Sequence, residues 1–274
     1  MISLFPSRTI ALEFFGFPIR WYGLLYLAGF LLAWWLLPRL QRYRGLTLTR
    51  EAWERLLGFS VLGVILGGRL GFVLFYEPMY FFAHPANIFA VWEGGMASHG
   101  GFLGVVIALL LALRQQKIDL LKLADVVVIP AALGLAIGRL GNLINQELYG
   151  TVTTLPWGLA IPGVEGLRHP APLYDALYNL LIAGLCFWHL TRPRYTPGRT
   201  AALFLILYGV FRFFIEFLRV QDYAPLSLWG VLLTRGQLLT LPFFFFGVFL
   251  WWWCSKRRLI SGMSSGAVDM VRTE

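Results

Sequence analysis

Residues 126–150 read VVVIPAALGLAIGRLGNLINQELYG, an apolar run that ends in a cluster of polar side chains. Arg139 and Asn142 are three residues apart, so both lie on one face near the end of a helix. The chain then leaves the apolar run through two polar residues and a glycine, Asn145, Glu147 and Gly150. A guanidinium beside exposed backbone N–H groups at a turn is typical of an anion site. The stretch therefore predicts a membrane-embedded helix with an anion site at its mouth.

The composition of the whole chain predicts an integral membrane protein. Hydrophobic residues make up 58% of the 274 residues, charged residues make up 14%, and the mean hydropathy is +0.68. Soluble domains carry about 25% charged residues, so a soluble fold could not cover this much apolar surface. The net charge is +9, but no motif of interleaved basic and aromatic residues is present. We therefore expect no nucleic-acid partner.

The two cysteines, Cys186 and Cys254, lie far apart inside apolar runs. This arrangement argues against a disulfide framework and against a zinc site. The N-terminal segment is interrupted by proline and by charged residues, and no small-residue cleavage site follows it, so it does not match a signal peptide. We expect the first spanning segment to stay in the membrane.

Seven stretches are apolar enough to cross a bilayer, which takes roughly 17–25 residues each. They cover residues 21–38, 56–76, 99–113, 124–141, 173–190, 200–218 and 237–254. Neither a separate soluble domain nor an internal repeat is evident, so we expect one domain over residues 1–274. The predicted class is all-α, a bundle of seven transmembrane helices.

The basic residues predict the orientation of this bundle. Fifteen Lys and Arg residues fall after the first, third and fifth segments and in the C-terminal tail, and five fall on the other side. Because basic loops stay in the cytoplasm, the N-terminus is expected outside and the C-terminus inside. The periplasmic loops are then expected near residues 77–98, 142–172 and 219–236.

Three arginines remain inside spanning segments: Arg69, Arg139 and Arg212. An arginine at the centre of a bilayer costs about 2.5–3.5 kcal/mol on insertion scales, and such residues usually mark a functional site. We therefore expect all three to face a cavity or a partner.

Residues 208–219, YGVFRFFIEFLR, place a polar stripe on one of these segments. Tyr208, Arg212, Glu216 and Arg219 are spaced by four, four and three residues, so they share one helix face. The alternative is an internal Arg212–Glu216 salt bridge that only lowers the cost of burial. Leucine at both positions would lower that cost further, which favours a functional stripe.

A third cluster, EGGMASHGGFLG at residues 93–104, surrounds His99 with glycines. Glycine permits close backbone approach and an irregular entry into the membrane. Histidine titrates near neutral pH and can move a proton. An interfacial hydrogen-bonding group is the alternative role for His99.

Together the three clusters place arginines, carboxylates, a histidine and tyrosines on the outer half of the bundle. Arginine matches the geometry of phosphate, and the anion most available within a membrane is a phospholipid head group. The residues therefore predict a multipass protein that handles phosphate or lipid. A transporter is the alternative, because intramembrane Arg/Glu pairs also line translocation paths; no inverted repeat with broken helices supports it.

The stretch GRLGNLINQELYG resembles the signature of the prolipoprotein diacylglyceryl transferase family. Further pieces resemble that family in the same order over nearly the whole chain: WYGLLYLAGF (21–30), LGGRLGFVLFY (66–76), EGGMASHGG (93–101), RHPAPLYDALYN (168–179) and YGVFRFFIEFLR (208–219). The resemblance implies a multi-pass enzyme of the bacterial inner membrane. Such an enzyme moves the diacylglyceryl group of phosphatidylglycerol to the lipobox cysteine of a preprolipoprotein. A thioether forms, glycerol phosphate leaves, and neither a metal nor a cofactor takes part.

The resemblance also implies roles for individual residues. Arg139 is expected to bind the phosphate with help from Asn142, and Arg212 is expected to be a second key arginine, held or tuned by Glu216. His99 is the candidate that accepts the proton of the thiol, directly or through water. Further substrate-binding positions are expected at Tyr22, Arg69, Asn145, Glu147, Gly150, Tyr208 and Arg219.

Some positions depart from the family's usual pattern. Gln146 stands where a small residue is common, and Ala171-Pro172 and Asp175 stand where Ser/Thr-Gln and Glu are common. A lipid-binding paralogue with an altered acceptor is therefore an alternative reading of the same motifs.

Overall fold

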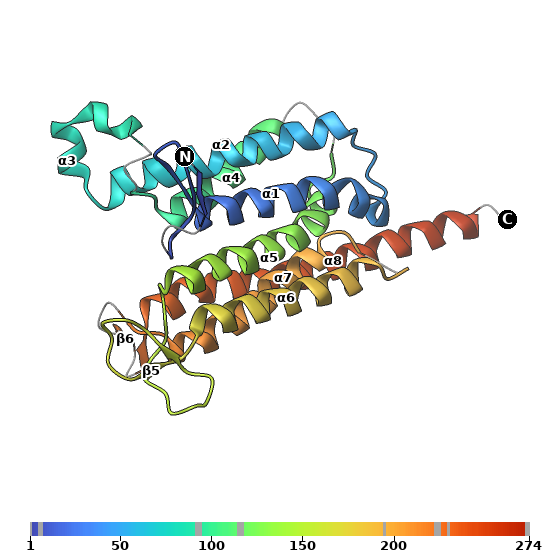
Figure 1. Ribbon diagram of the computed structural model, residues 1–274. Helices are drawn as coiled ribbons and strands as arrows, with labels where there is room; N and C mark the ends of the chain where they lie inside the picture. Colours follow the sequence, from blue (N-terminus) through green and yellow to red (C-terminus); the bar gives the residue numbers. More distant parts are fainter. Residues whose placement is uncertain are drawn as a thin grey trace. The chain divides into compact units, whose positions relative to one another are not determined.

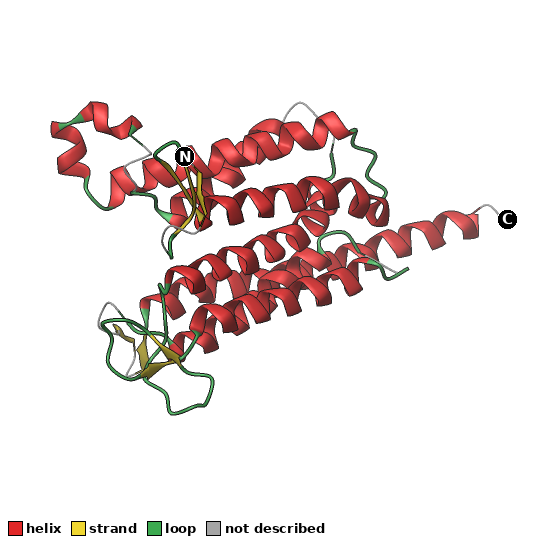
Figure 2. Ribbon diagram, viewed as in Figure 1, coloured by secondary structure: helices red, strands yellow, loops and turns green. Residues whose placement is uncertain are grey.

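The computed structural model describes residues 2–4, 8–90, 95–113, 118–193, 196–221, 226–228 and 231–271 (Figure 1). Within these ranges, the structure describes only the backbone of residues 2–4, 98–99, 102, 228, 231 and 258–271. The described chain is dominated by helices, as Figure 2 shows. The predicted helical membrane class is therefore confirmed.

Six of the predicted segments form helices that are long and apolar enough to cross a membrane in the part of the chain that the structure describes. They are α1 (Trp21–Leu40), α2 (Arg50–Phe75), α5 (Leu120–Asn145), α6 (Ala171–Leu190), α7 (Arg199–Ile215) and α8 (Arg235–Val271). The span that contains α7 continues through the next turn to Leu218 and has 20 residues. The predicted segment at 99–113 forms α4 (Ser98–Leu113), which has only 16 residues. Seven crossings therefore remain a prediction.

The described chain outside the long helices contains short elements that the sequence did not indicate. The N-terminal strands β1 (Ile2–Leu4), β2 (Ile10–Phe14) and β3 (Phe17–Arg20) form an antiparallel sheet. Two hairpins follow later in the chain, β4 (Leu159–Ala160) with β5 (Leu167–Arg168), and β6 (Leu226–Leu228) with β7 (Val231–Leu233). The remaining elements are α3 (Pro78–Ala83) and the three-ten helices η1 (Gln41–Arg44), η2 (Pro85–Phe89) and η4 (Glu216–Leu218). Strands this short give too little period-two alternation to be recognised.

The chain divides into two compact units. The first contains Met1–Gly45 and Leu120–Glu274, and the second contains Leu46–Asp119. In the first unit, α5 packs against α1, α6 and α7, and α7 also packs against α6 and α8. Cys186 and Cys254 are buried here as free thiols, which confirms that they form no disulfide.

A buried ion pair fixes one end of this unit. The Arg44 Nε lies 2.8 Å from Asp125 Oδ2, and neither side chain is exposed. Asp125 also accepts hydrogen bonds from the backbone N–H groups of Gly198 (3.0 Å) and Ala201 (2.9 Å), at the start of α7. Arg44 in turn donates to the Leu190 carbonyl at the end of α6. The pair therefore joins three helices, so Arg44 has a structural role besides its place among the basic loop residues.

In the second unit, glycines bring the backbones of α2 and α4 into direct contact. Gly63, Gly67 and Gly71 of α2 face Gly100 and Gly104 of α4. A Cβ on Gly67 would lie 2.3 Å from the Gly100 carbonyl oxygen. Small residues permit such close approach between membrane helices, where lipid offers no hydrophobic drive for association. The paired glycines near His99 therefore pack α4 against α2.

We expect Asp125→Asn to lower the free energy of unfolding by about 3–5 kcal/mol, because it removes the charged partner of a buried guanidinium. Chemical denaturation in detergent micelles, followed by circular dichroism, measures this. The matched control is Glu54→Gln, since Glu54 forms an exposed pair with Arg50 at 3.5 Å. That control should change the free energy of unfolding by less than about 1 kcal/mol. An equal loss of unfolding free energy in both variants would show that the buried Asp125 pair stabilises the protein no more than the exposed pair does.

Gly67→Ala should destabilise the second unit by about 1–3 kcal/mol, the usual cost of overpacking. Gly58→Ala lies in the same helix, and a Cβ on Gly58 meets nothing within 4 Å. It should be neutral or stabilising by about 0.5–1 kcal/mol, because alanine favours the helix over glycine. Melting temperatures of the two variants in one detergent compare them. A Gly67→Ala variant as stable as Gly58→Ala would contradict the close α2–α4 contact.

Candidate functional site

Arg139 lies near the C-terminal end of α5 and faces α6. Its Nε is 3.3 Å from Oδ2 of Asp175, in the second turn of α6. Its Nη1 donates to the Asn142 side-chain oxygen over 3.4 Å, which confirms the predicted pairing of these two residues. The Arg139 side chain is 21% exposed and that of Asp175 is 1% exposed. The arginine therefore has a buried anchor and an accessible flank.

Asp175 also binds a second arginine. The Arg219 Nη1 donates to the same Oδ2 atom over 3.3 Å. Arg219 follows η4, in extended backbone. Sequence reasoning noted Asp175 only as a departure from a family pattern and did not assign it to the site. One signal was available, since Asp175 is the only acidic residue in the otherwise apolar segment of α6.

Glu216 begins η4, directly after the end of α7. Arg212, one turn earlier, donates through Nη1 to Glu216 Oε2, and Arg219 Nε lies 3.9 Å from the same oxygen. Ion pairs therefore link Arg212, Glu216 and Arg219, among them the internal Arg212–Glu216 pair, but only Arg212 lies within α7. A functional role for this stripe stays a prediction. Tyr208 lies one turn before Arg212, and its ring centroid is 6.5 Å from that of Tyr178.

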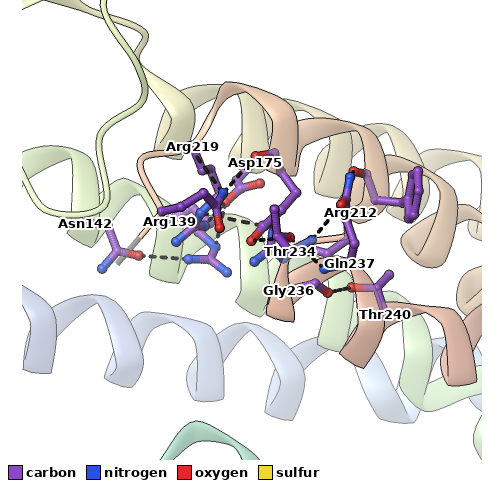
Figure 3. A network of polar contacts seen from close by, with 12 residues as sticks. Arg139, Asn142, Asp175, Arg212, Arg219, Thr234, Gly236, Gln237 and Thr240 are labelled. Carbon is purple, nitrogen blue, oxygen red and sulfur yellow. Dashed lines mark hydrogen bonds and ion pairs between the residues drawn. The ribbon is translucent and has the colours of Figure 1, made fainter. Parts of the chain in front are cut away.

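These contacts form one chain of alternating charges, Arg139–Asp175–Arg219–Glu216–Arg212 (Figure 3). We name it the charge chain. It contains three guanidinium groups and two carboxylates, so it carries one excess positive charge. Burial, and then repulsion from Arg212, lower the pKa of the Arg219 guanidinium. An anion bound here would relieve that repulsion.

A second polar group continues from Asn142. Its amide nitrogen donates to the Tyr22 hydroxyl of α1 over 3.1 Å and to Glu147 Oε2 over 3.4 Å. Asn145 donates to the other Glu147 oxygen over 2.8 Å. The structure therefore brings Tyr22, Asn142, Asn145 and Glu147 together beside Arg139, and their binding of substrate stays a prediction.

The backbone after α5 is strained where it returns Glu147 to this group. Gln146 and Leu148, on either side of Glu147, have φ angles of 57° and 54°. Residues with side chains rarely adopt this left-handed conformation, and such strain clusters at functional sites. Sequence reasoning noted Gln146 as a departure but had no means of detecting the conformation.

Gly150 fixes the backbone that carries Arg219. Gly150 and Arg219 form an isolated antiparallel bridge, and the adjacent Thr151 N–H donates to the Leu218 carbonyl over 2.9 Å. A Cβ on Gly150 would lie 2.4 Å from that carbonyl oxygen. The predicted glycine is therefore required for this close approach.

The start of α8 completes the site and was absent from the sequence predictions. Thr234 donates through its hydroxyl to Glu216 Oε1 over 3.3 Å. Figure 3 shows Thr234, Gly236 and Gln237 beside Arg212. Thr234 precedes the predicted segment 237–254 and belongs to no apolar repeat, so no sequence signal indicated its role.

Arg69 belongs to the second unit and is 5% exposed. Its guanidinium donates to the backbone carbonyls of Asn87, Ile88 (2.9 Å) and Gly95 (3.3 Å). These bonds hold Asn87 and Ile88 of η2, and Gly95, against α2. A substrate contact by Arg69 stays a prediction.

His99 lies in the first turn of α4, and its side chain is outside the described part of the structure. Glu93 of the same motif is also outside the described residues. The predicted role of His99 as proton acceptor therefore stays a prediction.

Comparison with known proteins assigns a family to this site. The family model described as prolipoprotein diacylglyceryl transferase matches residues 9–253. The chain is 44% identical to the phosphatidylglycerol–prolipoprotein diacylglyceryl transferase of Geobacter sulfurreducens, over 88% of this chain and 92% of that protein. It is 43% identical to the protein of the same name from Cereibacter sphaeroides, over 89% and 94% of the two chains. For the protein of Nitratidesulfovibrio vulgaris the identity is 41%, over 91% and 95%.

The matched region contains the charge chain, the polar group around Asn142 and the start of α8. The chain therefore belongs to the prolipoprotein diacylglyceryl transferase family.

Proposed function

We propose that the charge chain binds the phosphate of phosphatidylglycerol while a prolipoprotein cysteine attacks the glyceryl carbon. As a member of this family, the protein transfers the diacylglyceryl group of phosphatidylglycerol to a prolipoprotein, the first step of lipoprotein maturation. The observation that carries the proposal is the chain of ion pairs that connects Arg139 with Arg212.

We place the site at the outer face of a bacterial inner membrane. The charge chain comes from the end of α5, the start of α6 and the end of α7. The loops at these ends are the ones that carry few basic residues, so the positive-inside rule assigns them to the periplasm. In this arrangement α4 is the seventh crossing, the N-terminus is outside and the C-terminus is cytoplasmic.

Arg139 and Arg219 bind the phosphate in this proposal. Both are held by Asp175 at 3.3 Å, and both side chains keep an exposed fraction, 21% and 13%. A guanidinium offers a fork of N–H donors that matches phosphate oxygens. Asn142 assists by fixing Arg139 from its other side. One excess positive charge matches the single negative charge of a phosphodiester.

The chemical step forms a C–S bond and breaks the C–O bond to the phosphate. The leaving oxygen keeps the electron pair, so negative charge grows on glycerol phosphate as the bond breaks. Arg212, fixed by Glu216 in a site of low dielectric, stabilises that growing charge. The lipobox cysteine of the preprolipoprotein must lose its proton to become the nucleophile. His99 is the proposed acceptor of that proton.

The test is an in vitro assay with phosphatidylglycerol vesicles and a lipobox peptide. It follows the mass gain of the peptide and the release of glycerol phosphate. Arg139→Lys and Arg212→Lys should each lower the rate by about 10²–10³-fold, because lysine keeps the charge but loses the fork. Arg50→Lys, at an exposed position on α2, is the control and should be unaffected. Full activity of Arg139→Lys or Arg212→Lys would show that the paired N–H donors of the guanidinium are not needed for transfer.

Asp175 provides a second test of the charge chain. Asp175→Asn should lower the transfer rate by about 10–100-fold, because two guanidinium groups lose their shared anchor and shift. Asp175→Glu keeps the charge, so it should retain more activity than Asp175→Asn. Rates normalised to folded protein, measured in the same vesicle assay, make the comparison. Equal rates for the two variants would show that the charge of Asp175 does not matter.

A further inference from the structure

The carboxylate of Glu216 lies directly against the backbone of Gly236. A Cβ on Gly236 would be 2.1 Å from Glu216 Oε1, 2.4 Å from Cδ and 2.8 Å from Oε2. These distances are far below van der Waals contact. A side chain at position 236 would therefore overlap the Glu216 carboxylate in its observed position.

The first turn of α8 is held firmly around Gly236. The Thr234 backbone N–H donates to Gln237 Oε1 over 3.0 Å, and the Gln237 N–H donates to the Thr234 hydroxyl oxygen over 3.1 Å. This reciprocal pair is a capping box. Thr240 adds a hydrogen bond of 2.6 Å to the Gly236 carbonyl. Gln237 is fully buried, so the backbone at Gly236 has little freedom to withdraw.

The same turn favours a carboxylate. The Thr234 hydroxyl donates to Glu216 Oε1, and the N-terminal end of a helix carries partial positive charge. On its other side, Glu216 accepts from Arg212. Its carboxylate is thus held between the start of α8 and the Arg212 guanidinium, and the residue is only 5% exposed.

We infer that Gly236 is a positioning residue for the transfer reaction. It provides the gap in which the Glu216 carboxylate sits, and the carboxylate in that place aims the Arg212 guanidinium at the leaving phosphate. This inference rests on the proposed function of the charge chain. Gly236 itself contacts Glu216 and acts on the reaction through it.

The inference predicts which kinetic parameter changes. A methyl group at position 236 displaces the Glu216 carboxylate and, with it, Arg212. Arg139 keeps its contact with Asp175, because the three atoms nearest to a Cβ at position 236 all belong to Glu216. Arg219 loses only its longer contact with Glu216 (3.9 Å) and keeps its contact with Asp175 (3.3 Å). Binding of phosphatidylglycerol then persists, whereas stabilisation of the leaving phosphate is lost. The effect should therefore fall on kcat.

The experiment compares Gly236→Ala with the wild-type protein in the vesicle assay. We expect kcat to fall by about 10–100-fold, since a displacement of about 1 Å can cost this much. KM for phosphatidylglycerol should stay within about twofold, as expected when ground-state binding is retained. Gly184→Ala is the control, because a Cβ at that position in α6 meets nothing within 4 Å. It should leave both parameters unchanged.

A second substitution separates positioning from simple damage to α8. Glu216→Asp withdraws the carboxylate by about one C–C bond, roughly 1.5 Å, which makes room for the methyl group. We expect Gly236→Ala with Glu216→Asp to be more active than Gly236→Ala alone. Gly247→Ala tests the same helix elsewhere, since its Cβ would lie 2.9 Å from Ile206 N and from Leu205 Cβ. Glu216→Asp should not rescue Gly247→Ala.

The outcomes distinguish this inference from the proposed function. An inactive wild-type protein with phosphatidylglycerol and lipobox peptide would refute the proposed function itself. An active wild-type protein and an equally active Gly236→Ala variant would overturn only the inference. A Gly236→Ala variant whose loss lies mainly in KM, or that Glu216→Asp fails to rescue, would also overturn it.

Discussion

The site depends on two carboxylates that hold three arginines inside a protein built mostly from apolar helices. A single guanidinium at this depth is costly, and a charge left without a partner costs more than an apolar side chain. Asp175 and Glu216 reduce that cost by bridging neighbouring arginines, at 3.3 Å from Arg139 and Arg219 in the case of Asp175. Because α5, α6 and α7 each contribute a charge, the same contacts also hold the ends of the three helices together.

The long helices could be predicted because apolar length is a strong signal that tertiary context rarely overrides. Helices α1, α5, α6 and α7 begin and end within a few residues of the predicted segments. Helix α2 begins earlier than predicted, at Arg50, because the Thr49 side chain caps it by accepting from the Ala52 N–H. The regular spacing of Arg212, Glu216 and Arg219 was also visible in the sequence, although α7 ends at Ile215 and Arg219 follows η4 in extended backbone.

The rest of the site could not be predicted, because it depends on contacts between distant segments. Asp175 is 36 residues from Arg139 and 44 from Arg219, so its place as the only acidic residue of α6 does not reveal which arginines it binds. Gly236 is one of 29 glycines, and its contact with the Glu216 carboxylate is seen only in the folded chain. The left-handed backbone at Gln146 and Leu148 is likewise invisible in the composition of the segment. Motifs thus identified the arginines and Glu216, whereas the roles of Asp175 and Gly236 could be recognised only in the folded chain.

The single excess positive charge of the charge chain has a consequence for turnover. Phosphatidylglycerol carries one negative charge on its phosphodiester, but glycerol phosphate is a monoester that approaches two near neutral pH. In the proposed reaction the charge chain therefore attracts glycerol phosphate more strongly than the incoming lipid. Release of glycerol phosphate is then a step that the protein must assist, for example by admitting water to Arg139 and Arg219, which retain solvent exposure on 21% and 13% of their side-chain surface.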